Sequence, residues 1–159
     1  MPETAEPPWV IRPATARDSD ALLRWRNDPT NFQWFLAASP VRIEEHRIWL
    51  TERLARDEPA LWVLDIDGVA GGTVRIDEDS ASSAFASIVV DPALRGRGYG
   101  RRLLAFLDAQ ARTLGVVELR ALIHPENVAS QVLFTVAGYH EEPADPAGFS
   151  TYVRSLTSA

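Results

Sequence analysis

The stretch Arg95-Gly96-Arg97-Gly98-Tyr99-Gly100-Arg101-Arg102 places three glycines and four arginines within eight residues. It stands between an apolar run at 87–90, which predicts a strand, and the segment 103–107, which predicts a helix. Glycines at a strand-to-helix turn let backbone N–H groups gather around an anion, and the helix N-terminus adds a partial positive charge. Arginine contributes planar donors that suit phosphate. The stretch therefore predicts a binding site for a phosphorylated ligand.

Two other phosphate-binding loops do not match this stretch. A P-loop requires the pattern G-x-x-x-x-G-K-[ST], and the chain contains no lysine. The dinucleotide fingerprint G-x-G-x-x-G requires a glycine at the position of Arg101. A kinase or a nucleotide-dependent oxidoreductase is therefore disfavoured. An alternative without any ligand remains, in which the glycines form a plain tight turn and the arginines are only solvated.

Composition narrows the class of protein further. The 159 residues carry a net charge of −6, which argues against a nucleic-acid-binding surface. The absence of cysteine excludes disulfides and a thiol nucleophile, and no apolar run approaches the ~20 residues of a membrane span. We expect a cytoplasmic protein with no membrane association, a disordered lead-in at 1–8 and a single domain at 9–159.

Strands and helices are expected to alternate around the glycine-rich loop. The run at 84–90 is almost continuously apolar, so we place it centrally in the sheet. Thr15 predicts a helix N-cap with Asp18 as its capping-box partner, and residues 30–40 predict a loop. The expected strands are 9–12, 61–66, 69–76, 84–90, 117–123 and 149–156, and the expected helices are 16–26, 42–56, 103–114 and 128–136. This order predicts an α+β, or mixed α/β, sandwich around one sheet.

The pattern Arg95-x-x-Gly98-x-Gly100 follows Val89-Val90-Asp91-Pro92, and a helix that begins Asn127-x-x-Ser130 comes later. Together these segments resemble the acyl-CoA loop and its surroundings in the GNAT N-acetyltransferase superfamily, and the order of elements extends the resemblance over most of the chain. The resemblance implies an α/β/α sandwich around one mixed, mostly antiparallel twisted sheet that splays at its central strands. It also implies an acyltransferase with acetyl-CoA as cosubstrate and no metal.

The resemblance assigns cofactor-binding residues. It implies that the backbone of Ile88, Val89 and Val90 pairs with the pantetheine arm of the cofactor. It also implies that loop amides bind the pyrophosphate, and the loop residues are Arg95, Gly96, Arg97, Gly98, Tyr99, Gly100 and Arg101. Asn127 matches a position that contacts the cofactor, and it fits equally well as a plain helix N-cap.

Direct acetyl transfer needs a neutral amine, a polarised thioester carbonyl and a stabilised thiolate. A backbone N–H near Val89 or Val90 would polarise the carbonyl. Many members of the superfamily carry a tyrosine as general acid where this chain has Phe134, which cannot donate a proton. Ser130, one turn earlier, is a candidate donor through water, although a serine there also fits simple helix packing.

The general base has no clear marker, because residues 84–87 lack the glutamate that some relatives have on this strand. His124, at the end of the strand 117–123, is one candidate, since an imidazole with a pKa near ~6.5 accepts a proton from an ammonium. His46 is another. Each histidine also fits a role without chemistry. His124 could be a structural residue before Pro125, and His46 could occupy a partly exposed position on its helix.

The acceptor site is expected between the first two helices. The segments W-R-N-D-P at 25–29 and E-H-x-x-W at 45–49 resemble the RimJ/RimL-type branch, and most closely N-acetyltransferases that modify nucleotide-linked amino sugars. The candidate substrate-binding residues are Trp25, Arg26, Asn27, Trp34 and Trp49. Trp25 and Trp49 also fit the hydrophobic core, and Arg26 fits either a diphosphate contact or a solvated helix end.

Several acceptors and one different class remain open. A protein N-terminal amine and an aminoglycoside are alternative acceptors, and the acidic charge mildly favours a cationic one. The missing tyrosine and glutamate would also suit a non-catalytic acyl-CoA-binding module. The expected partner is a small-molecule amine acceptor, with no nucleic acid and no membrane, and the protein is expected to be a monomer or homodimer.

Overall fold

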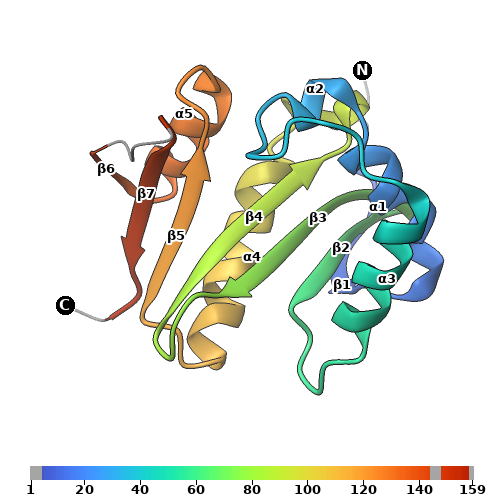
Figure 1. Ribbon diagram of the computed structural model, residues 1–159, viewed down its shortest axis with the longest axis horizontal. Helices are drawn as coiled ribbons and strands as arrows, with labels where there is room; N and C mark the ends of the chain where they lie inside the picture. Colours follow the sequence, from blue (N-terminus) through green and yellow to red (C-terminus); the bar gives the residue numbers. More distant parts are fainter. Residues whose placement is uncertain (1–4, 144–147, 158–159) are drawn as a thin grey trace.

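One sheet of seven strands organises the chain (Figure 1). The computed structural model describes residues 5–143 and 148–157. The strands are β1 (Trp9–Pro13), β2 (Leu61–Ile66), β3 (Val69–Glu78), β4 (Ser83–Val90), β5 (Glu118–Ile123), β6 (His140–Glu142) and β7 (Ser150–Ser155). Their spatial order is β1-β2-β3-β4-β5-β7-β6, and every neighbouring pair is antiparallel except β4 and β5. The predicted mixed, mostly antiparallel sheet is confirmed.

Helices cover both faces of this sheet, as predicted. The helices are α1 (Ser19–Arg26), α2 (Pro29–Phe32), α3 (Ile43–Leu54), α4 (Tyr99–Thr113) and α5 (Val128–Val136). Helices α1 and α3 pack on one face, whereas α4 crosses the other face behind β3 and β4 (Figure 1). None of the helices within the described residues is long and apolar enough to cross a membrane.

The sheet splays between its two parallel strands. Strand β4 pairs with β5 only through residues 83–85 and 118–120, while its other edge stays paired with β3 as far as Val90. Beyond Phe85 the two strands diverge, and β5 continues alongside β7 to Ile123 (Figure 1). The predicted central place of β4 and the predicted splay are both confirmed, and the splay leaves one edge of residues 86–90 without a strand partner.

The pleat of the strands builds two hydrophobic clusters. In β2, Trp62 and Leu64 join the cluster beneath α4, whereas Leu61 and Val63 join the cluster beneath α1 and α3. In β4, Ile88 packs toward α4 and Val89 toward α1 and α3. Since successive side chains of a strand point to opposite faces, β4 presents side chains to both layers of helices.

The N-terminal region shows one confirmed cap and one unpredicted helix. The Thr15 capping box with Asp18 is present as predicted. Helix α2 replaces the start of the loop that was expected at 30–40. It forms because the Asp28 carboxylate accepts the amide of Thr30 (2.8 Å) and Pro29 occupies the first turn.

Segments near both ends of the chain differ from what the sequence predicted. The expected lead-in is only partly described: Glu6 pairs with Arg102, the Pro8 carbonyl accepts the amide of Asp67, and residues 1–4 lie outside the described residues. Strand β6 was also not predicted, since its three residues are polar and too few for a periodic signal.

Candidate active site

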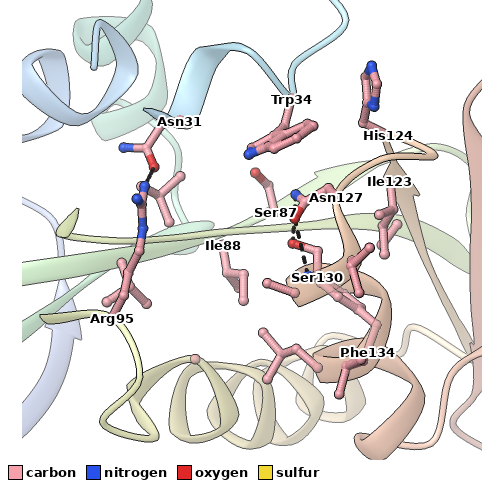
Figure 2. Close-up of a pocket in the computed structure, with 18 of the residues that line it drawn as sticks. Asn31, Trp34, Ser87, Ile88, Arg95, Ile123, His124, Asn127, Ser130 and Phe134 are labelled. Atoms are coloured by element: carbon pink, nitrogen blue, oxygen red, sulfur yellow. Dashed lines mark hydrogen bonds between the residues drawn. The ribbon is translucent and has the colours of Figure 1, made fainter. Parts of the chain in front are cut away.

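The splay opens into a cavity of about 980 Å³, which we call the cofactor cavity (Figure 2). Its walls are residues 86–90 of β4, most of the glycine-rich loop, the end of β5, helix α5 and the region of α2. A second cavity of about 630 Å³, the acceptor cavity, lies on the α1 and α3 side of the sheet. Six residues line both cavities: Trp34, Phe35, Ala86, Ser87, Val89 and Leu122. The two cavities therefore meet at the open part of β4.

Strand register shows which amides of β4 face the cofactor cavity. The Asp91 amide donates to the Gly71 carbonyl of β3 (2.9 Å), and the register places Val89 opposite Thr73. Residues of an antiparallel pair alternate between bonding the partner strand and facing away from it. Val89 therefore bonds toward β3, whereas the N–H and C=O groups of Ile88 and Val90 point toward the splay. Of the two amides expected to polarise a carbonyl, the amide of Val90 faces the cavity.

The glycines of the loop serve two different purposes. Gly96 and Gly98 have φ values of +77° and +84°, and Gly98 is the N-cap residue of α4. A side chain on either would meet no neighbour within 4 Å, so the backbone conformation selects glycine there. At Gly100 a Cβ atom would lie 3.0 Å from Leu133 Cδ2, so α4 packs closely against α5 there and a larger residue would require the Leu133 side chain to shift.

The loop side chains do not all face the cofactor cavity. Arg95 turns to α2, where it donates to Thr30 Oγ1 (3.0 Å) and Asn31 Oδ1 (2.6 Å) (Figure 2). Tyr99 lines the cavity but is largely buried in the core, and Arg101 is an exposed residue of the cavity wall. Arg97 is exposed and lies outside the lining. Arg95 thus braces α2, which forms one wall of the cavity.

Asn127 and Ser130 form a connected pair at the start of α5. The Asn127 side chain accepts the Ser130 amide (3.3 Å), and its Nδ2 donates to Ser130 Oγ (3.0 Å) (Figure 2). Asn127 is therefore the N-cap and also lines the cofactor cavity. Because Ser130 Oγ already accepts a bond, its own proton remains available. Phe134, one turn further on, lines the same cavity without a polar atom.

His124 lies at the rim of the cofactor cavity (Figure 2). Its ring makes edge contacts with Trp34 and Phe149, at centroid distances of 5.2 and 5.4 Å. Its Nδ1 accepts the amide of Glu126 (3.1 Å), so the neutral ring carries its proton on Nε2. The ring nitrogen that would take up a proton is therefore already engaged.

His46 lines the acceptor cavity rather than the cofactor cavity. The alternative of a partly exposed helix position is wrong, since His46 is only 4% exposed, between the body of α3 and α1. Burial lowers the pKa of His46, and a hydrogen bond with the Ser19 backbone only partly opposes this. Its Nε2 is enclosed and has no hydrogen-bond partner among the described residues. His46 is therefore a neutral imidazole at pH 7.

We expect His46 to make the protein less stable as the pH falls from about 7 to 5. Its folded-state pKa lies below the unfolded value of ~6.5, so the unfolded chain binds the extra proton first and gains stability from it. The measurement is the free energy of urea unfolding at pH 7.5 and 5.5 for the wild type and His46→Asn. The variant should lose less stability between the two pH values, and an identical pH dependence would contradict the assignment.

The predicted substrate-binding residues separate into distinct groups. Trp34 lines both cavities, and Trp49 and Arg26 line the acceptor cavity. Trp25 also borders the acceptor cavity, but it is 1% exposed and its Nε1 donates to Asp91 Oδ2 (2.9 Å), which makes it a core residue. Asn27 lines neither cavity, because both of its amide atoms bond the backbone of Val41.

The structure adds wall residues that the sequence analysis missed. Thr73 and Arg75 of β3 line the acceptor cavity, and Phe149 closes it from the far side of the splay. The alternation of polar and apolar residues along β3 could have predicted Thr73 and Arg75. Both lie on the face of the strand opposite the core residues Val74 and Ile76. No signal in the sequence pointed to Phe149, which is distant in the chain from the rest of the wall.

Comparison with known proteins agrees with this architecture. A family model described as an acetyltransferase (GNAT) domain matches residues 9–140. An uncharacterized protein from Methanocaldococcus jannaschii is 23% identical over 133 residues, which cover 82% of this chain and 28% of that protein. The chain thus spans little more than a quarter of that relative's length.

Two solved structures illustrate the shared fold. The yncA protein of Salmonella typhimurium, solved with its cofactor acetyl-CoA, superposes with a TM-score of 0.83 at 22% identity and 96% coverage of both chains. Ribosomal-protein-alanine N-acetyltransferase from Brucella melitensis superposes with a TM-score of 0.74 at 28% identity, covering 91% of this chain and 96% of its own. The family match, over most of the described chain, shows that this protein belongs to the acetyltransferase (GNAT) domain family.

Proposed function

We propose that the protein is an N-acetyltransferase that moves the acetyl group of acetyl-CoA directly to a primary amine. The observation that carries this proposal is the meeting of two cavities at the unpaired edge of β4. The cofactor would place its pyrophosphate on the amides of the glycine-rich loop and the start of α4. Its pantetheine arm would pair with the exposed edge of Ile88 and Val90. The thioester would then lie where the acceptor cavity opens beside Ser87.

The proposed transfer is a single addition and elimination at the thioester carbon. The amine nitrogen bonds to the carbonyl carbon, the C–S bond breaks, and the products are an amide and the thiol of CoA. A backbone amide on the open edge of β4 would stabilise the carbonyl oxygen as it becomes negative and so lower the barrier. Ile88 and Val90 both face the splay, and for a thioester beside Ser87 the nearer amide is that of Ile88. Ser130 Oγ–H supports protonation of the departing thiolate, which is modestly basic because a thiol has a pKa of ~8.5.

Of the two histidines considered as general base, His46 is the one on the acceptor side. His46 lines that cavity and has an unoccupied ring nitrogen, whereas the accepting nitrogen of His124 is already bonded to the Glu126 amide. We propose that His46 accepts the proton of the amine. Because its Nε2 is enclosed, the proton would reach it through a water or a substrate group that enters the cavity.

A nucleotide-linked amino sugar is the acceptor that we propose first. The segments at 25–29 and 45–49 support it, and aromatic walls suit the apolar face of a sugar ring. Those walls are Trp34, Phe35, Trp49 and Phe149. A protein N-terminal amine is the second candidate, supported by the 28% identity to the Brucella enzyme that is named for ribosomal-protein alanine.

The direct test is thiol release from acetyl-CoA with a panel of amines, followed by mass measurement of the acceptor. We expect turnover that depends on the amine and a gain of one acetyl group, about 42 Da, on nitrogen. Reactions without amine provide the baseline for hydrolysis. Acetyl-CoA binding without acetylation of any sugar, peptide or aminoglycoside amine would favour a non-catalytic acyl-CoA-binding module.

A further inference from the structure

We infer that Arg26 and Arg75 form an anion-binding subsite in the acceptor cavity, so that the acceptor amine carries a carboxylate or phosphate group. The inference rests on the proposed function, because it names the chemical class of molecule that this cavity receives. It goes beyond the segment resemblance, since Arg75 belongs to neither segment.

Both guanidinium groups come from rigid elements that flank the same cavity. Arg26 is the last residue of α1 and Arg75 lies in β3, and both line the acceptor cavity. Arg26 lies over the Phe35 ring at 4.9 Å and Arg75 over the Trp49 ring at 5.5 Å. Stacking on an aromatic face leaves the edge of the guanidinium, which carries the N–H donors, free to meet an oxyanion.

The two arginines keep donors available for a ligand. Arg26 donates to the carbonyls of Ser39 (3.1 Å) and Ala37 (3.0 Å), which holds the side chain in place without neutralising it. Arg75 uses Nε for Asp77 (2.8 Å), and its terminal nitrogens have no hydrogen-bond partner among the described residues. Since a guanidinium has five N–H groups, each side chain can still donate to an anion.

Among the described residues, Arg26 has no carboxylate to balance its charge. Asp77 is paired with both Arg53 and Arg75, and no carboxylate of the described residues pairs with Arg26. Glu45 is the other acidic residue of the wall, and it is exposed. Burial and the nearby charge of Arg75 lower the pKa of Arg26. Arg26 has no carboxylate partner among the described residues and Arg75 shares its partner with Arg53, so an anion placed between these two partly buried cations would stabilise both.

The test variant is Arg75→Gln, because Arg53 still pairs with Asp77 and the loop contacts of Arg26 stay intact. The matched control is Arg56→Gln, which removes the same charge from a surface pair with Glu78 outside both cavities. Two pairs of probes are titrated by calorimetry into CoA-saturated protein. L-phenylalanine is compared with L-phenylalaninamide, and UDP-glucosamine is compared with glucosamine.

We expect one probe that carries the anionic group, L-phenylalanine or UDP-glucosamine, to bind at least about 10-fold more tightly than the partner that lacks this group. Arg75→Gln should weaken that probe by about 10- to 100-fold, the range for a lost hydrogen bond to a charged group, and should leave the Kd for acetyl-CoA unchanged. Arg56→Gln should match the wild type. The phenylalanine pair reports a carboxylate acceptor, and the UDP-glucosamine pair reports a diphosphate acceptor.

Equal affinity within both pairs, including no detectable binding of any probe, would overturn the subsite, as would equal effects of the two arginine variants. Thiol release distinguishes this failure from failure of the proposed function. If amines without a carboxylate or phosphate group are acetylated as well as amines that carry one, the subsite fails and the transferase stands. If an anionic probe binds through Arg75 and no amine is ever acetylated, the transferase fails and the subsite stands.

Discussion

Replacing Gly98 with valine is expected to weaken acetyl-CoA binding by about 100-fold or more, a loss of roughly 3 kcal/mol. Gly98 has φ of +84° and is the N-cap residue of α4, where the first amides of the helix face the proposed pyrophosphate. Valine disfavours this conformation, and its branched side chain would occupy the open space in front of the loop. The measurement is the Kd for acetyl-CoA by titration calorimetry.

Gly68→Val separates backbone strain from loss of the binding site. Gly68 has the same φ of +84° and the same open surroundings, but it lies in the turn between β2 and β3. Both variants should lose about 1–2 kcal/mol of unfolding free energy from the strained backbone. Only Gly98→Val should lose the cofactor. A folded Gly98→Val protein with wild-type affinity would remove this loop from the site.

Replacing Trp25 with alanine is expected to lower the free energy of unfolding by about 3–5 kcal/mol, which is typical of removing a large buried side chain. Trp25 is 1% exposed and packs between α3 and β2 with Leu22, Leu50 and Val63. Its loss would also leave Asp91 Oδ2 without its indole donor, next to the glycine-rich loop. The measurement is chemical denaturation followed by circular dichroism.

Trp49→Ala is the matched comparison, because Trp49 is only half-buried and lines the acceptor cavity. We expect a smaller loss of stability and a larger change in acceptor kinetics than for Trp25→Ala, measured under conditions where both proteins are folded. If Trp25→Ala kept its stability and lost only acceptor turnover, Trp25 would be a substrate-stacking residue and not part of the core.

Local signals explain why much of the fold was predictable. The apolar run of β4, the glycines at 96 and 98, the Thr15 capping box and the Asn127 cap each depend on neighbours within about four residues. A short window therefore contains all the information that these features need. The central place of β4 followed from its apolar run, because a strand that is buried on both faces is almost continuously apolar.

The features that sequence analysis missed depend on distant partners. Helix α2 has four residues, and Arg95 from the glycine-rich loop braces it. His46 appeared to be a partly exposed helix position, and it is buried because α1 packs over it. The helical period alone could not show this, since the hydrophobic face of α3 is weakly marked around that position.

The sequence by itself determined the local conformation of the glycine-rich loop. Glycines with positive φ precede the N-terminus of α4, which suits the proposed pyrophosphate, and both features are local properties of the chain. Only the tertiary structure decided which residues line the acceptor cavity. The acceptor cavity joins α1, α3, β3 and Phe149, and the partnership of Arg26 with Arg75 arises because a folded sheet brings together residues 49 positions apart. No pattern of neighbouring residues encodes such a meeting, since it depends on packing over the whole domain.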